Sequence, residues 1–509
     1  MSHPQNRRRF LTQVAQTGTF VGSLSLPALS ALGPLQAADT AIAPDVVQFH
    51  PEIEALVRLI EETPRQELLE QMGRRVKSGL SYREVLAALF LAGIRNVQPR
   101  PSVGFKFHAV LVVNSAHIAS QSGPDSDRWL PIFWALDEFK SSQARDVREG
   151  NWTMPALKDS AVPDAEHVRP AFQTAMDTWD EEKADGAAAG LARYVGATEV
   201  LEWFARYAAR DFRSIGHKAI YVANAWRTLQ TIGWHHAEPV LRSLAYALLN
   251  HNGEPNPAKN QLSPDEPWRQ NQAQAAAIRP NWLSGKLDAK ATTELLQVLR
   301  TESAEQSAAA VVGMVNAGVS PGSIFDALHV GAGELLMRQP GIVALHAVTS
   351  TNAIRFLFDA TGDDQTRRLL MLQNASFLPL FREAMKGRGA VKDTTVETLT
   401  ASAANESAAD SLHGVFDAIR PNPDEAANRI LSYLESGYSP QDLLTGARRL
   451  IFLKGTNAHD YKFSSAVLED FYNVSPAWRN RFLATAAFNL RGSNDSDNGL
   501  VNRIQSAVG

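Results

Sequence analysis

The sequence predicts an all-α protein that is internally duplicated, with two pseudo-symmetric halves of two helical units each. Apolar residues recur at helical spacing along most of the chain, as in Val85, Leu86, Leu89, Phe90 and Ile94. The period-two patterns that are typical of strands are almost absent. Segments of the first half also return, in the same order, in the second half. These three observations together predict helices packed on helices.

The duplication is visible in glycines and histidines that keep their spacing. The separation from Gly79 to His108 differs by a single position from the separation between Gly318 and His346. A second histidine follows in each half at a similar distance, His217 after His108 and His459 after His346. A period of about 110 residues is too long for the common short-repeat solenoids, which favours two halves facing each other. The histidines in register are His108, His217, His346 and His459.

Proline, glycine and polar residues mark the predicted breaks between units. The segment 253–290 is expected to be a Pro-rich linker, because its five prolines forbid a continuous helix. The opening helix of the first unit is expected over Pro51 to Lys77. The predicted boundaries are a signal peptide at 1–38, helical units at 39–142, 169–252, 291–385 and 409–491, the linker at 253–290 and a tail at 492–509.

The N-terminus resembles a twin-arginine export signal. Arg7-Arg8-Arg9-Phe10-Leu11 precedes a weakly apolar stretch to Leu32 and the small residues Ala37-Ala38. An ordinary secretory signal is the alternative. The resemblance implies recognition by the twin-arginine export machinery, a periplasmic or extracellular location and, because that route carries folded proteins, a cofactor. The apolar stretch is too short and too polar for a stable membrane span.

Composition excludes several function classes. The chain contains 50 Lys and Arg against 54 Asp and Glu, with no basic stripe, so no nucleic-acid partner is expected. It contains no cysteine, which excludes disulfides, thiolate metal sites and cysteine nucleophiles. No established metal-binding signature and no Gly-rich phosphate loop is present.

The segment Gly318-Val319-Ser320-Pro321-Gly322 matches the Gly-x-Ser-x-Gly pattern of serine hydrolases, and we reject that interpretation. The corresponding segments begin Gly79-Leu80-Ser81 and Gly437-Tyr438-Ser439 and lack the second glycine. Acidic residues three positions after two of the serines have capping-box spacing. These serines are therefore predicted to begin helices.

The four histidines in register are the candidate site residues. Neutral imidazole is a common ligand of iron, copper and zinc and a common general base, so His108, His217, His346 and His459 are predicted to be metal ligands or proton-transfer groups. Tyr221 follows His217 by four residues on the same helix face and is added as a catalytic candidate. The alternative, held about equally, is that each histidine is a hydrogen-bonded core residue.

Other histidines and the tryptophans are weaker candidates for the site. His117 is half a turn out of phase with His108 and is expected to point elsewhere. His329 has no counterpart in the other half and is expected at the surface or rim. Nine of the ten tryptophans lie in 129–282. They could line an aromatic pocket, although core packing is the favoured interpretation; the pocket candidates are Trp134, Trp203 and Trp226.

The segment Leu345-His346-Ala347-Val348-Thr349-Ser350, with the helix at 367–381, resembles the questin oxidase-like family. Gly216-His217-Lys218-Ala219-Ile220-Tyr221 is similar to it as well. The resemblance implies a mostly helical fold and Baeyer–Villiger-type oxygenation of aromatic polyketides, with His346 and His217 in the matching segments. The export signal and the long linkers depart from that family's pattern.

The sequence thus predicts an exported oxidoreductase whose histidine-lined site lies between duplicated halves. Because no cysteine is present, the electron carrier is expected to be a metal such as iron or copper, a haem or a bound organic molecule, acting on a small-molecule substrate. The rival hypothesis is a non-enzymatic helical-repeat protein of the cell envelope that binds a partner, with structural histidines.

Overall fold

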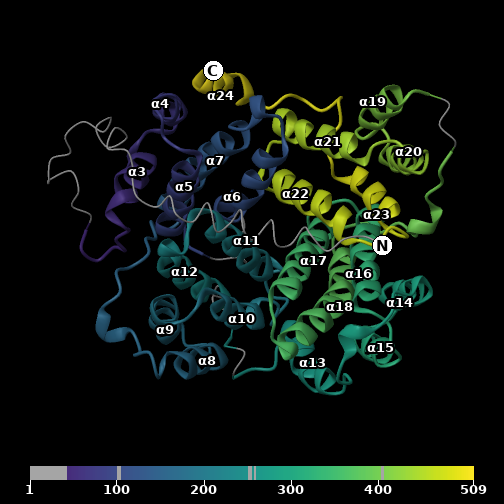
Figure 1. Ribbon diagram of the computed structural model, residues 1–509, viewed down its shortest axis with the longest axis horizontal. Coiled ribbons are helices and arrows are strands. Elements are labelled where there is room, and N and C mark those ends of the chain that lie inside the picture. The colour runs from purple at the N-terminus through teal and green to yellow at the C-terminus, as the bar shows by residue number, and fades with distance from the viewer. Residues whose placement is uncertain (1–42, 100–104, 250–254, 257–258, 403–405) are drawn as a thin grey trace, which may run out of the picture.

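The computed structural model describes residues 43–99, 105–249, 255–256, 259–402 and 406–509. These residues form 22 α-helices, α3 to α24, and no strand, so the predicted all-α class is confirmed. The expected signal peptide at 1–38 lies outside the described residues. The helices form four groups that occupy the four corners of the view in Figure 1.

The first group, at the upper left of Figure 1, contains five helices. The single helix predicted over Pro51 to Lys77 is wrong: Pro64 divides it, because a proline disfavours helical backbone at the residue before it and lacks an N–H. The helices are α3 (Pro51–Glu62), α4 (Arg65–Lys77), α5 (Tyr82–Asn96), α6 (Phe105–Ser122) and α7 (Leu130–Arg148).

The second group lies at the lower left. Its Ala-rich helix α9 packs closely on α8 and α12, and Gly186 and Gly190 permit contact with residues 161–168. The helices are α8 (Val168–Thr178), α9 (Glu181–Tyr194), α10 (Ala197–Ala208), α11 (His217–Ile232) and α12 (Ala237–Leu249).

The third group lies at the lower right. It begins inside the segment predicted to be a linker, where Pro267 falls in the first turn of a helix, a position that tolerates proline. The helices are α13 (Glu266–Ala276), α14 (Ala289–Thr301), α15 (Ala304–Asn316), α16 (Pro321–Arg338), α17 (Ile342–Ala360) and α18 (Asp364–Lys386).

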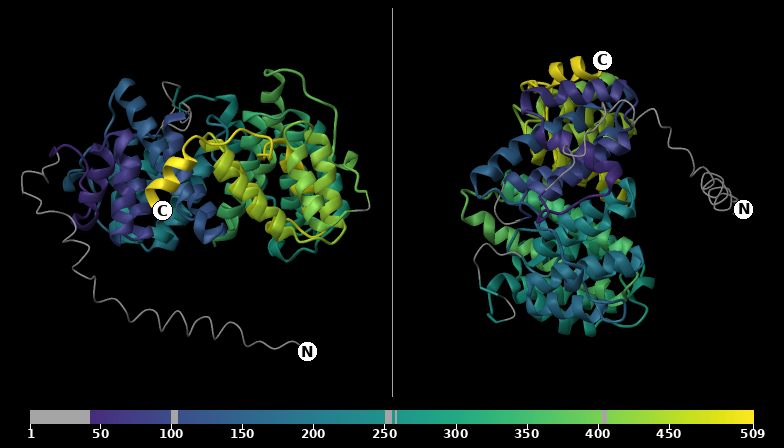
Figure 2. Two further views of the ribbon diagram at one scale, coloured as in Figure 1. Left: turned by 90° about the horizontal axis from the view of Figure 1, so that it is seen from above. Right: turned by 90° about the vertical axis from the view of Figure 1, so that its left-hand side faces the viewer.

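The fourth group lies at the upper right, and the chain then returns to the first group. The last helix packs on α4 beside the N-terminal helices (Figure 2, left). Arg503 on this helix pairs with Glu70 on α4 at 2.7 Å. The helices are α19 (Ala408–Ala418), α20 (Pro423–Glu435), α21 (Pro440–Lys454), α22 (Ala458–Asn473), α23 (Arg479–Thr485) and α24 (Val501–Val508).

One helix from each group meets at the centre of the molecule. Helix α6 packs on α11 and α22, and α17 packs on the same two helices, so the four form a closed ring. His108 and His217, in the first turns of α6 and α11, are in contact. Asn114 and Asn224, about two turns later on the same two helices, are in contact as well. Neighbouring central helices therefore run in the same direction, and their N-terminal ends converge. Parallel neighbours need long return connections, which the outer helices provide.

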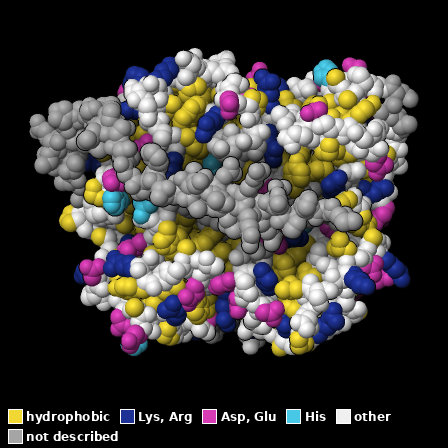
Figure 3. All heavy atoms as spheres, in the orientation of Figure 1, with side chains coloured by type: hydrophobic (Ala, Val, Ile, Leu, Met, Phe, Trp, Pro, Cys, Tyr) yellow, Lys and Arg dark blue, Asp and Glu magenta, His cyan; other side chains and the backbone are white. Residues whose placement is uncertain are grey.

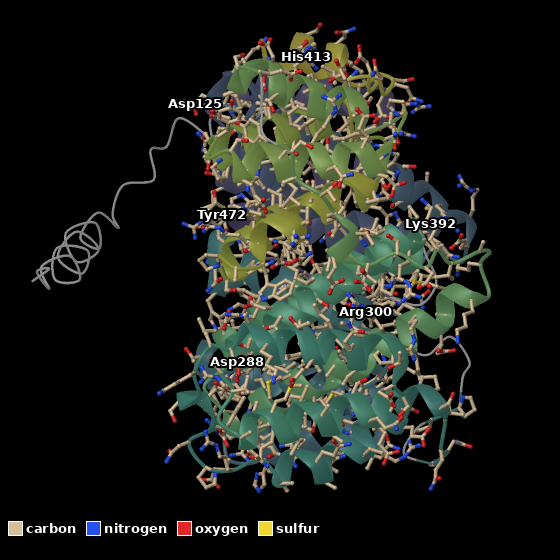
Figure 4. All side chains as sticks on the ribbon, turned by 90° about the vertical axis from the view of Figure 1, so that its right-hand side faces the viewer. Asp125, Asp288, Arg300, Lys392, His413 and Tyr472 are labelled. Atoms are coloured by element: carbon tan, nitrogen blue, oxygen red, sulfur yellow. The ribbon has the colours of Figure 1, made fainter. Side chains whose placement is uncertain are left out.

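The outside of the molecule carries mixed charge. Figure 3 shows basic and acidic side chains interspersed over the described part of one face. Lys392, His413 and Tyr472, labelled in Figure 4, lie at the surface. Among the described helices, none combines the length and the apolar composition that crossing a bilayer requires.

Candidate functional site

The four histidines predicted to share a site come together where the central helices begin. His108 lies in the first turn of α6, His217 opens α11, His346 lies in the first turns of α17 and His459 is the second residue of α22. All four side chains are buried. Because the N-terminal ends of the four helices converge, these four residues, which are far apart in sequence, form one cluster, which we call the histidine cluster.

Local backbone features hold two of the histidines in place. Gly216, which precedes His217, has φ +83°, and a Cβ there would collide with the side chain of Ser350 on α17. Glycine thus permits α11 to begin in contact with α17. Asn457 caps α22, and its side chain accepts a hydrogen bond from the backbone N–H of His459 at 2.9 Å.

The imidazole nitrogens lie at contact distance. His217 Nε2 is 2.9 Å from His108 Nε2 and 2.9 Å from His346 Nε2. His108, His346 and His459 each bring one ring nitrogen within 4.8 Å of the others. The ring centroids of His108 and His459 are 4.4 Å apart. The four side chains therefore form a single site.

Hydrogen bonds to the backbone fix the tautomers of two histidines. His217 Nδ1 lies 2.8 Å from the carbonyl oxygen of Ser214, and His346 Nδ1 lies 2.6 Å from that of Ile342. A carbonyl can only accept, so both Nδ1 atoms carry the proton. In the neutral rings both Nε2 atoms then carry lone pairs, and these lone pairs face each other at 2.9 Å.

Two opposed lone pairs repel each other unless a proton or a metal ion lies between them. Nitrogens bound about 2.0–2.1 Å from one ion lie about 2.9 to 3.4 Å apart, depending on the ligand angle, and the observed spacing of 2.9 Å is at the short end of this range. The Nδ1–H bonds to carbonyls are also the usual outer-sphere support of a metal-ligating histidine. His108, His346 and His459, with His217 in contact, thus form a buried cluster that could bind a metal ion.

A proton is a poor alternative to the metal. Burial, with the nearby amine of Lys462 adding to it, lowers the pKa of His108, His217 and His346 well below the ordinary value. The same causes lower the pKa of His459 to about 3. The imidazoles therefore stay neutral, which is the form that binds metal.

Lys462 is an unanticipated member of the site. It follows His459 by one turn on α22, is buried, and its Nζ has no hydrogen-bond partner among the described residues. Burial lowers its pKa to about 7. A buried ammonium without a carboxylate is costly, so the neutral amine is accessible at ordinary pH. The sequence carries only a weak signal, which is that none of the residues three and four positions away on α22 is acidic.

A narrow polar cavity lies beside Lys462, farther along the same four helices. It has room for about one water molecule. Asn352 donates hydrogen bonds to Glu469 and Asp470 at 2.8 Å, and the partly exposed Glu469 also pairs with Arg227. The polar side chains around this cavity include Asn114, Asn224, Asn352, Arg227 and Lys462.

The other predicted residues lie elsewhere. The hydroxyl of Tyr221 lies 2.7 Å from Ser243 Oγ on α12, so its bond is directed away from the histidines. His117 contacts the Tyr82 hydroxyl at 3.0 Å and points elsewhere, as predicted. The expectation that His329 lies at the surface or rim is wrong: its side chain is buried, and its Nδ1 lies 3.4 Å from a carboxylate oxygen of Asp470.

Two further predictions are tested by the geometry. Ser81, Ser320 and Ser439 cap α5, α16 and α21, which confirms that they begin helices. The three candidate tryptophans do not share a pocket, because each has a separate aromatic partner. The pairs are Trp134 with Tyr461, Trp203 with Phe172, and Trp226 with Trp234.

Fold and site together define a class: an all-α protein with a buried histidine cluster at the converging ends of four parallel helices. No family model, no curated protein and no solved structure matches the chain.

Proposed function

We propose that the protein is a metal-dependent oxidoreductase whose metal is held by His108, His217, His346 and His459. The observation that carries the proposal is the pair of lone-pair nitrogens of His217 and His346 facing each other at 2.9 Å. Carbonyl acceptors fix both tautomers and burial opposes protonation, which supports a metal ion as the partner of these two nitrogens.

Imidazole ligands suit iron and copper, the two redox metals that we propose for the site. The rings are in contact, and the neighbouring cavity admits about one water, which favours a bare ion over a haem. Such an ion supplies one-electron redox steps that this cysteine-free chain cannot supply from its own side chains.

The chain's own residues then have defined tasks. The four histidines bind and orient the ion, and the surrounding helices exclude bulk water from it. Lys462, with its pKa near 7, can be neutral beside the ion and so avoids repelling it. The cavity lined by Asn114, Asn224 and Asn352 gives one water molecule a polar place next to Lys462.

We also propose that the central helices are the products of an internal duplication and that the protein acts after export to the periplasm or beyond. Each of the four helix groups contributes one central helix with a histidine at its start, which supports the duplication. The arginine pair near the N-terminus supports export by the twin-arginine route. The oxygenase activity implied by the questin oxidase-like resemblance is one form of this redox function.

The test is metal analysis and redox titration of protein purified after native export. We expect about one iron or copper per chain, with a visible or electron paramagnetic resonance signal that dithionite changes and air restores. Full occupancy by zinc would support the metal site and contradict the redox function, because zinc has no redox chemistry. A metal-free protein that binds none of these ions would overturn the proposal and favour the rival scaffold function.

A further inference from the structure

A second cavity lies away from the histidine cluster, between α4, α7, α24 and the residues that lead into α22. Its volume is about 390 Å³, within the range of small-ligand pockets. Trp134 and Leu500 supply apolar wall, and Thr456 supplies a hydroxyl. Four charged side chains line the cavity and determine which ligand it can bind: Arg65 on α4, Asp137 and Glu138 on α7, and Arg503 on α24.

The two arginines of the cavity already have anionic partners. Arg65 donates two hydrogen bonds to the carboxylate of Asp137, at 2.9 and 2.6 Å. Arg503 donates two to Glu70, at 2.7 and 2.8 Å, and further bonds to backbone carbonyls of α4. Both guanidinium groups are therefore neutralised, and the cavity offers little to an anionic ligand.

Glu138 is the remaining charge. Its side chain lines the cavity and makes no hydrogen bond or ion pair with the described residues. Burial raises its pKa, the carboxylate of Asp137 raises it further, and Arg65 lowers it. A half-buried carboxylate without a partner is unfavourable, and a ligand cation would supply the missing partner.

The aromatic wall is already formed. Trp134 stacks on Tyr461 with ring centroids 4.3 Å apart and an angle of 26° between the planes. Tyr461 is buried and covers one face of the indole, and Trp134 is itself 4 % exposed, so it borders the cavity as a fixed apolar surface. An indole beside a carboxylate is the pairing that recognises organic ammonium ions. A divalent metal would need several free oxygen ligands, and both oxygens of Asp137 are taken by Arg65.

We propose that this cavity binds a small organic monocation, with its ammonium charge against Glu138 and its hydrocarbon part against Trp134 and Leu500. The site is separate from the histidine cluster, and its test requires no metal.

The experiment is calorimetric titration of the full chain with choline and with 3,3-dimethylbutan-1-ol, which has the same shape and no charge. We expect choline to bind and the alcohol not to bind. Glu138→Gln should weaken choline at least about tenfold, the effect of losing one well-placed charge. Glu149→Gln, on the exposed end of α7, is the matched control and should leave binding unchanged.

The pH dependence gives a second readout. Choline keeps its charge at every pH, so the pH dependence of binding comes from the protein. The charged side chains that face the cavity are Glu138, Asp137, Arg65 and Arg503. As pH falls through the raised pKa of Glu138, binding should be lost at a pH above the ordinary value of 4.5. Equal binding of the alcohol, no choline binding to the wild type, or full binding by Glu138→Gln would each overturn the proposal.

Discussion

His217 and His346 face each other through nitrogens that both carry lone pairs when the rings are neutral. Their Nε2 atoms lie 2.9 Å apart, while each Nδ1 donates its proton to a carbonyl about one turn away or less. The relationship joins the start of α11 to the start of α17, which are 129 residues apart in sequence. The proposed metal function rests on this geometry.

Removing one ligand should weaken the site strongly. We expect His346→Ala to lower the affinity for added Cu²⁺ or Fe²⁺ by at least about 100-fold, because the ion loses one of its imidazole ligands. Thermal shift on titrating metal into chelator-treated protein measures this. His413→Ala, at an exposed histidine seen in Figure 4, should leave the shift intact. An unchanged shift in His346→Ala would place the metal elsewhere.

The metal-free protein should lose stability in acid because its histidines resist protonation. The folded pKa of His459 is about 3 and its ordinary value is 6.5, so the unfolded chain binds the extra proton between these values. Stability therefore falls as pH drops below about 6.5, by about 1.4 kcal/mol per pH unit for each such histidine. Urea unfolding of metal-free protein between pH 6.5 and 4.5 measures the slope. His459→Gln should reduce the slope by that amount, and an identical slope would contradict the pKa assignment.

Lys462 should make the protein less stable at pH 7 than at pH 9.5. Burial lowers its pKa from 10.5 to about 7, so the unfolded state binds more protons throughout this window. Stability therefore rises with pH, by about 1.4 kcal/mol per unit. Lys462→Met should be more stable than the wild type at pH 7 and should lose this dependence. Urea midpoints at the two pH values test the expectation; a wild type with equal midpoints would show that Lys462 stays charged when folded.

The serine in Gly79-Leu80-Ser81 should affect stability alone. Its side chain accepts a hydrogen bond from the backbone N–H of Glu84, and the Glu84 carboxylate accepts one from the backbone N–H of Ser81. Ser81→Ala should cost about 1 kcal/mol of unfolding free energy and leave the metal content unchanged. Ser78→Ala, at the preceding helix end, is the control and should cost less. Loss of metal in Ser81→Ala with normal stability would reopen a functional role for the serine.

The fold class could be predicted from sequence because helix periodicity and capping are local. The Ser81 cap and the proline starts of α16 and α21 are readable from a few neighbouring residues. The division of the first helix is equally local, since Pro64 itself marks it. The parallel ring of central helices could not be predicted from the sequence, because it depends on how helix groups that are far apart in the sequence pack against one another.

The sequence could predict which histidines belong to the cluster, but it could not predict how their rings are arranged. Regular spacing identifies the four histidines, while their tautomers depend on carbonyls such as that of Ser214, which only the folded backbone places. Lys462 carries no strong signal because a single lysine on a helix is ordinarily solvated. The burial of His329 is hidden for a related reason: its partner Asp470 lies on a different helix, far along the chain, so nothing local indicates it.

X-ray absorption spectroscopy of the metal-loaded protein tests the central claim most directly. The account predicts an iron or copper edge and a first shell of nitrogen ligands at about 2.0–2.1 Å, with the outer-shell scattering of several imidazoles. His217→Ala should remove about one imidazole from that pattern. A shell of oxygen ligands without imidazole scattering, or a spectrum that His217→Ala leaves unchanged, would contradict a metal held by the histidine cluster.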